Sequence, residues 1–370
     1  MKNNHWFMAV LVIFLTACSS VQQPEVVLNA HNLKLITPSQ PLPIPANTQV
    51  IALGETHYVS EHAQFIASQM PYWTELGFRK FVFECNAALS VPLNDYVHGR
   101  LDAIAEDPLY SVELPIAQVI RQWNESQPLE RQWDFVAIDI NHQPETFNAY
   151  VLALANRAPW QQWFAQNQIN LHQPKVFKTL AEQLAVSSAK PEAIDTNEWQ
   201  QFLWQTDFAL RGDKLNFLFW SLRREKLMIE SIAKQVGDAP YVLNVGMNHA
   251  QKSSHWSYGT GTYYTLIGEW LNATTPTYHI AFHAWQGTKR WRFRGPTFEY
   301  DKGEELKESD LLYWMHQQSQ SRLSYVDLSE PEFKHVWRLD DYRQRPGHHF
   351  DALVLYPEST VYPSLEKHFP

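Results

Sequence analysis

Cysteine is scarce in this chain of 370 residues, which holds only Cys18 and Cys85. We expect Cys18 to be lipidated. Cys85 then has no cysteine to pair with, which excludes an internal disulfide. No positively charged residue lies next to Cys85 in the sequence to activate a thiolate. We therefore interpret Cys85 as a small buried hydrophobic residue rather than a nucleophile.

Several catalytic and binding motifs are missing as well. There is no Gly-x-Ser-x-Gly turn, so a serine triad of the α/β-hydrolase type is not expected. There is also no Gly-rich Walker loop and no His-Glu-x-x-His zinc motif. Blocks of like charge are absent and the formal net charge is −9. This charge argues against nucleic acid as the main partner.

Apolar and aromatic residues, by contrast, are abundant. Of all residues, 45% are hydrophobic and 14% are aromatic, and 15 are tryptophans. This composition supports a sizeable core, which we expect in one large domain over residues 29–370. Most of the tryptophans should pack in that core, and some should line a cleft.

The first residues are typical of an exported protein. Lys2 precedes a short apolar core, Phe7 to Leu15, which falls below the about 18 residues that a membrane-spanning helix needs. Leu15-Thr16-Ala17-Cys18 resembles the lipobox of bacterial lipoproteins. We therefore expect a signal peptide over residues 1–17 and acylation of Cys18, for example with palmitate.

The residues after Cys18 bear on where the anchor lies. Ser19 and Ser20 lack the aspartate that retains many such proteins at the inner membrane. The expected location is the cell envelope, with the lipid anchor in the outer membrane and a polar tether over residues 18–28.

The hydrophobic pattern predicts an α/β fold with a mostly parallel central sheet flanked by helices. Strands are predicted at 49–55 and 80–85, with a helix over 57–76 that Gly77 ends. The three form a strand–helix–strand unit whose two strands are expected to pair in parallel. Further strands are predicted at 133–139, 241–246, 263–267, 278–284, 323–328 and 350–355. Residues 287–308 are polar and are interpreted as a hairpin or loop.

The segment from about 144 to 236 has a different character. It is rich in Gln, Ala, Leu and Trp and has few glycines. We interpret it as a long helical insertion of several amphipathic helices, broken near Pro174 and Pro191. Such an insertion is expected to form a lid or one wall of a cleft.

Acidic residues and histidines follow the predicted strands where the strands end. Glu55 and His57 come after the first strand, and His249 follows the strand at 241–246. Glu84 and Asp139 end two further strands. Because ligands bind outside the carboxyl ends of the strands in open α/β sheets, we expect these side chains to form one site.

The chemistry expected of this site is hydrolysis with a general base. A carboxylate beside a neutral imidazole fixes its tautomer and raises its basicity, so the histidine can take a proton from water. Glu84 would orient either imidazole, and Asn248 would donate to developing negative charge. A second interpretation stays open, because Glu55, His57 and His249 would also suit a divalent metal ion.

At these motifs the chain resembles the erythromycin esterase family, within a wider group that includes ChaN-type haem-binding lipoproteins and Tiki-type metalloproteases. The resemblance is spread over the mature chain. It is carried by Gly54-Glu55-Thr56-His57 with Glu61, Gly77-Phe78 with Glu84, Arg224-Glu225 with Met228, Asn248-His249, and Phe350 to Val354.

The resemblance implies an α/β core, a deep cleft and hydrolysis by histidine-activated water without a covalent serine intermediate. His57 would be the general base, Glu55 and Glu84 would orient and polarise, and His249 would assist at the oxyanion or the leaving group. Glu61, Asp139, Asn248 and Arg224 are the expected substrate-binding residues. The expected partner is a small-molecule ester or lactone, and no cofactor is expected.

Two departures from the esterases keep other functions open. One residue, rather than two, separates Glu55 from His57, and Tyr58 stands where the esterases carry a glycine. This spacing is closer to the ChaN-type and Tiki-type branches. A haem- or iron-binding lipoprotein, a metal-dependent peptidase and a non-catalytic envelope scaffold therefore remain as alternatives to the lipid-anchored hydrolase.

Overall fold

The structure is a computed structural model that describes residues 33–369, apart from 38–39, 141–142, 188, 216–219, 254, 258–261, 291, 293, 305–310, 330–332 and 334–348. The expected signal peptide, residues 1–17, and the expected tether, residues 18–28, lie outside the described residues. Among the residues described, no helix is both long and apolar enough to cross a membrane.

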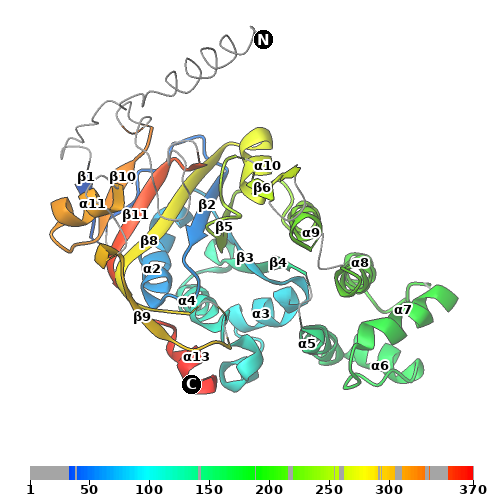
Figure 1. Ribbon diagram of the computed structural model, residues 1–370. Coiled ribbons are helices and arrows are strands. Elements are labelled where there is room, and N and C mark those ends of the chain that lie inside the picture. Colours follow the sequence, from blue (N-terminus) through cyan, green and yellow to red (C-terminus); the bar gives the residue numbers. More distant parts are fainter. Residues whose placement is uncertain are drawn as a thin grey trace, which may run out of the picture.

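A nine-stranded sheet forms the centre of the described fold (Figure 1). Its strands are β1 (Leu33–Leu35), β2 (Val50–Glu55), β3 (Lys80–Asn86), β4 (Asp134–Asp139), β5 (Tyr241–Gly246), β8 (Thr277–Lys289), β9 (Phe298–Asp301), β10 (Ser324–Asp327) and β11 (Ala352–Ser359). Their order is β1-β10-β11-β8-β2-β5-β3-β4, and β9 pairs with β8. The run from β11 to β4 is parallel, whereas β10 and β9 are antiparallel to their neighbours.

Helices cover both faces of this sheet, because successive strand residues point to opposite sides. On one face, Ile51 and Leu53 of β2 share a buried cluster with residues of α2 (Ser60–Glu75), α3 (Ser90–Val97) and α4 (Leu114–Glu125). On the other face, Val50 and Ala52 pack with residues of α9 (Trp220–Gln235), α10 (Ile267–Thr274) and α11 (Leu311–Ser319). The predicted α/β architecture is therefore confirmed.

Smaller elements complete the described chain. The strands β6 (His255–Ser257) and β7 (Thr262–Tyr264) form a separate antiparallel pair, and α13 (Pro363–His368) lies near the end. Short 3-10 helices are η2 (Ala87–Leu89), η3 (Ala103–Glu106), η4 (Pro108–Tyr110), η5 (Leu129–Arg131) and η7 (Lys302–Glu304).

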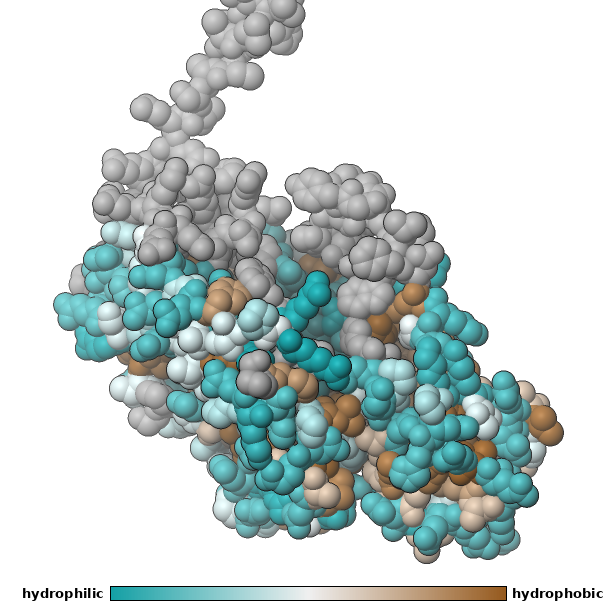
Figure 2. Space-filling model, turned by 60° about the horizontal axis from the view of Figure 1, so that its bottom comes forward, coloured by the Kyte–Doolittle hydropathy of each residue, from teal (hydrophilic) through white to brown (hydrophobic). Residues whose placement is uncertain are grey.

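The segment from 144 to 236 is helical, as predicted. It comprises α5 (Pro144–Ala155), α6 (Ala158–Gln166), α7 (Val176–Val186), α8 (Thr196–Asp213) and α9. The first four have a core of their own, in which Trp160, Trp163 and Trp199 pack with Phe202. Figure 1 shows this lobe to the right of the sheet, and Figure 2 shows hydrophobic and hydrophilic side chains mixed on the same side of the surface.

Three details of the predicted secondary structure are wrong. The strands β2 and β3 are parallel but not paired, because β5 lies between them and pairs with both. The helix predicted from residue 57 begins at Ser60, because Tyr58 takes a left-handed φ of 69° that breaks the helical turn. The strand predicted at 263–267 ends at Tyr264, and α10 begins at Ile267.

Candidate functional site

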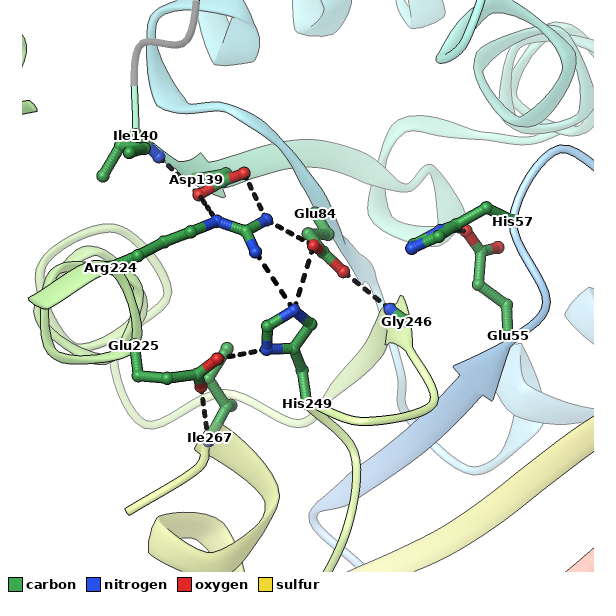
Figure 3. Close-up of polar contacts among 10 residues, drawn as sticks. All are labelled: Glu55, His57, Glu84, Asp139, Ile140, Arg224, Glu225, Gly246, His249 and Ile267. Carbon is green, nitrogen blue, oxygen red and sulfur yellow. Dashed lines mark hydrogen bonds and ion pairs between the residues drawn. The ribbon is translucent and has the colours of Figure 1, made fainter. Parts of the chain in front are cut away.

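The site lies at the carboxyl ends of four neighbouring parallel strands. β2 ends in Glu55, which is in register with Gly246 at the end of β5. The pairing of β3 with β4 shifts register between Phe83 and Asn86, so Glu84 lies in an irregular stretch of the strand. A break in the register turns side chains out of the regular alternation. The predicted meeting of strand-end acids and histidines is therefore found at this edge, as Figure 3 shows.

Glu55 holds the imidazole of His57 in one orientation. Nδ1 of His57 lies 2.9 Å from Oε1 of Glu55. The other carboxylate oxygen accepts a 2.6 Å hydrogen bond from the amide of Asn244. Because a carboxylate can only accept, Nδ1 of His57 carries the proton and its Nε2 is left as the acceptor.

A second histidine, His62, helps to fix the position of Glu55. Nε2 of His62 in α2 lies 2.6 Å from Oδ1 of Asn244, and its Nδ1 lies 3.2 Å from the hydroxyl of Tyr356. His62 is only 1% exposed, and burial lowers its pKa below the ordinary value of 6.5. A neutral His62 adds no positive charge to the site, so it positions Glu55 through Asn244.

His57 remains accessible while its partner is buried. The side chain of His57 is 42% exposed, against 5% for Glu55. Partial burial lowers the pKa of His57. The hydrogen bond with Glu55 and the charge of Glu84 together raise it by more, so the net pKa lies above 6.5. The paired carboxylate thus makes this imidazole a stronger base than a free histidine.

The absence of a side chain at Gly246 creates the space that His57 occupies. A Cβ atom built on Gly246 would lie 2.8 Å from Nε2 and 2.9 Å from Cε1 of His57. It would also lie 3.3 Å from Oε2 of Glu84. The imidazole therefore rests directly over the end of β5, beside the Glu84 carboxylate.

Tyr58, the residue after His57, has an unusual backbone conformation. Its φ of 69° is a left-handed conformation that costs a non-glycine residue about 1 kcal/mol or more. Its ring centroid lies 5.5 Å from that of His57, and its carbonyl accepts from the backbone N–H of Tyr362. This conformation places an aromatic side chain beside the imidazole.

Arg224 from α9 joins the acids at the ends of β3 and β4. Its Nε and Nη2 donate to the two oxygens of Asp139, at 2.9 and 2.7 Å. Nη2 also donates to Oε1 of Glu84, whose Oε2 accepts from the backbone N–H of Gly246. The charges of His249 and Arg224 outweigh burial and hold the pKa of Glu84 well below its usual range.

His249 is held as a cation in the same network. Its Nδ1 donates to Glu225, whose second oxygen accepts from the backbone N–H of Ile267 at the start of α10. Burial lowers the pKa of His249, but the charges of Glu84 and Glu225 raise it to about 10.

The protonation state of Nε2 of His249 determines how this atom interacts with its two neighbours. Nε2 lies 3.3 Å from Oε1 of Glu84 and 3.1 Å from Nη1 of Arg224. With a pKa of about 10, Nε2 is protonated near neutral pH and donates to Glu84. Arg224 is then a neighbouring cation that Glu84 bridges to His249, rather than a hydrogen-bond donor to it.

A cavity of about 510 Å³ opens beside these residues. Its polar lining includes Glu55, His57, Glu84, Glu113, Asp139 and Arg224. Tyr58, Phe83, Cys85 and Val112 supply an apolar part of the wall. The volume is in the range of about 300–1,000 Å³ that is typical of small-molecule sites.

Two of the residues expected to bind substrate do not line this cavity. Glu61 accepts hydrogen bonds of 2.8 Å from the backbone N–H and the hydroxyl of Thr360, after β11. Asn248 is exposed, and its Oδ1 lies 3.4 Å from Nε2 of Gln251. Neither is among the described residues that line the cavity, whereas Asp139 and Arg224 both line it.

Four residues that matter at this site were not predicted from the sequence to have a role in it. Glu225 fixes His249, Asn244 and His62 fix Glu55, and Glu113 lines the cavity. The position of Glu225 next to Arg224 in the sequence could have indicated its role. The other three have no local signal, because only the packing of α2, α4 and β5 brings them to the site.

The interpretation of the site as a divalent metal site was compared with the described part of the chain. Within it, no group of three or more His, Cys, Asp or Glu side chains is arranged to hold a metal ion. Of the three residues considered, His57 is paired with Glu55, whereas His249 is a cation held by Glu84 and Glu225. A metal ion would have to displace the proton of His249 before this imidazole could ligate it.

No family model and no curated protein matches the chain. Three solved structures share its fold. A mutant of the erythromycin esterase EreC in its open conformation is 14% identical, covers 85% of this chain and 92% of its own, and gives a TM-score of 0.58. A Bacillus cereus protein is 13% identical, with coverage of 90% and 96% and a TM-score of 0.61.

The third structure is a succinoglycan biosynthesis protein, 13% identical over 93% of this chain and 98% of its own, with a TM-score of 0.63. At these identities the likeness establishes the fold alone. The predicted similarity to the erythromycin esterase fold is thereby confirmed. A haem-bound ChaN of Campylobacter jejuni gives a TM-score of only 0.28, which supports no argument about haem.

Proposed function

We propose that this protein is a hydrolase that cleaves a carboxylic ester or lactone with water activated by His57. The observation that carries the proposal is the fixed orientation of His57. Its Nδ1 is committed to the buried Glu55, and its partly exposed ring lines the cavity. The fold shared with an erythromycin esterase mutant supports the choice of acyl chemistry.

In the proposed reaction, water attacks the acyl carbon while Nε2 of His57 takes its proton. The imidazolium that forms is stabilised by Glu55, which already accepts from Nδ1. Arg224 lines the cavity and offers fixed positive charge near the oxyanion that develops on the carbonyl oxygen. The carbon–oxygen bond of the ester then breaks, giving an acid and an alcohol.

Direct attack by water is favoured over a covalent intermediate. Among the described lining residues, Cys85 carries the side chain with the greatest intrinsic nucleophilicity. Burial, followed by the charges of Glu113, Asp139 and Glu84, raises the pKa of the Cys85 thiol well above its usual value. A thiol of this kind is a poor nucleophile.

The proposal is tested with the soluble domain, starting after Cys18, on a panel of alkyl esters, aryl esters and lactones. We expect turnover of at least one of them by the wild-type protein and its loss in His57→Ala. Turnover that is equal in the two proteins would contradict the assignment of the base.

Gly246→Ala should impair the same step without unfolding the protein. The added Cβ would lie 2.8 Å from Nε2 of His57, so the exposed ring must swing away from Glu55. A displacement of about 1 Å can cost about 100-fold in rate, and we expect a fall of that order in kcat/KM. Urea denaturation should show a change in the free energy of unfolding below about 1 kcal/mol. Unchanged kcat/KM would show that the position of His57 is unimportant.

We also propose that the protein is exported and anchored in the outer membrane through a lipid on Cys18. The support is the sequence pattern of residues 1–20. Mass spectrometry of the N-terminal peptide from the purified full chain tests it. The expected peptide begins at Cys18 and carries acyl groups, and an unmodified N-terminus would overturn the proposal.

A further inference from the structure

The hydrolytic cavity contains a buried carboxyl group that the proposed reaction has not yet used. Glu113 immediately precedes α4, and it lines the same cavity as His57. The residue is 7% exposed. Its Oε2 is buried and has no hydrogen-bond partner among the described residues. A buried carboxylate without a partner is costly, so this group has a reason to keep its proton.

Burial decides the protonation of Glu113 against two opposing effects. A hydrogen bond from its own backbone N–H and its place at a helix N-terminus both favour the ionised form. Burial outweighs them and raises the pKa of Glu113 to about 7. The groups that face it are the Cys85 thiol from β3 and the phenols of Tyr110 and Tyr362, and none of them is a cation.

Apart from the imidazolium that His57 forms during the reaction, the other groups of the site are not placed or protonated to donate near neutral pH. The pKa of Glu84 lies well below its usual range, so this group is ionised. His249 has a pKa of about 10 and is not among the described lining residues. Asp139 accepts two hydrogen bonds from Arg224. The hydrolysis of an unactivated ester needs a proton donor, because an alkoxide is a poor leaving group.

We propose that Glu113 is the general acid that protonates the departing alkoxide, which makes the cavity a site for unactivated alkyl esters or lactones. This inference rests on the proposed hydrolase function. His57 takes one proton from the attacking water, and the carbon–oxygen bond breaks as Glu113 gives its proton to the alcohol oxygen. The products are a carboxylic acid and an alcohol. Solvent then carries the proton from His57 back to Glu113, and both groups regain their starting states.

The role is tested with two esters of the same acid, one with an ethyl and one with a 4-nitrophenyl leaving group. The 4-nitrophenolate leaves without a proton, so only the ethyl ester needs the acid. We expect Glu113→Gln to reduce kcat/KM for the ethyl ester by about 10²–10⁴-fold, the range for general acid catalysis. The loss for the 4-nitrophenyl ester should be less than about tenfold by the same reasoning.

The matched control is Glu125→Gln, the same change at the exposed other end of α4, where Glu125 pairs with Arg121. It should leave both rates unchanged. Equal losses on the two esters in Glu113→Gln would overturn the general-acid role and leave the hydrolase function standing. No turnover of either ester by the wild-type protein, or of any other ester or lactone, would overturn both.

A stability measurement tests the proton on Glu113 without any substrate. The pKa is about 7 in the folded protein and 4.5 without its environment, so the folded state holds a proton that the unfolded state has lost between these values. Wild-type stability should therefore fall relative to Glu113→Gln as pH rises from about 4.5 to about 7. A constant difference would show that Glu113 ionises normally and would overturn the role.

Discussion

His57→Ala is expected to reduce kcat/KM for a hydrolysable ester by about 10²–10⁴-fold, the usual contribution of a general base. The loss should appear in kcat, because His57 acts on the attacking water and not on the bound ester. Since the side chain is 42% exposed, its removal leaves no buried gap. We expect the free energy of unfolding, measured by urea denaturation, to change by less than about 1 kcal/mol.

The control for this variant is His172→Ala. His172 lies in the exposed segment between α6 and α7, within the helical lobe. Its removal should change neither kcat nor stability. Loss of activity in both variants would point to an indirect effect of histidine removal, and full activity in His57→Ala would exclude His57 as the base.

Arg224→Met is expected to destabilise the protein by about 3–5 kcal/mol, the cost of leaving buried charges without their partner. The side chain of Arg224 is 12% exposed, and those of Glu84 and Asp139 are 7% and 4% exposed. Methionine fills part of the volume but cannot donate to either carboxylate. Glu84 and Asp139 would then be two buried carboxylates without the guanidinium that donates to both.

The pH dependence separates this electrostatic effect from a packing effect. As the pH falls, Glu84 and Asp139 can take up protons in Arg224→Met, so the difference in stability from the wild type should shrink toward low pH. Chemical denaturation at several pH values measures it. A loss that is small, or independent of pH, would contradict the described ion-pair network.

Arg121→Met provides the matched control. Arg121 also bridges two carboxylates, Asp102 and Glu125, but these are 81% and 60% exposed. Ion pairs at the surface contribute about 0–1 kcal/mol, because water solvates the charges when the pair is broken. The contrast between the two arginines therefore isolates the effect of burial.

The sequence predicts the edge of the sheet where the site lies because that information is local. Strand periodicity marks residues 50–55 and 241–246, and the next residues supply Glu55, His57 and the turn to His249. Parallel strands bring their carboxyl ends together, so the acids and histidines could be grouped before any contact was known.

The rest depends on tertiary packing, which the sequence pattern does not contain. The insertion of β5 between β2 and β3 follows from a strand that lies far along the chain. Glu113 looks like an ordinary acid before a helix, and only its burial in the cavity wall distinguishes it. Glu61 carries the expected motif spacing, yet it binds Thr360 because the end of β11 lies beside α2.

The pH dependence of kcat/KM in wild-type protein and Glu55→Gln tests the central claim, that Glu55 makes His57 the base. Activity needs neutral His57, so kcat/KM should fall as pH drops through the pKa of His57, which lies above 6.5 in the wild type. Removing the Glu55 charge removes a cause of that raised pKa, and the acid limb should move to lower pH. An acid limb at the same pH in both proteins would contradict the account.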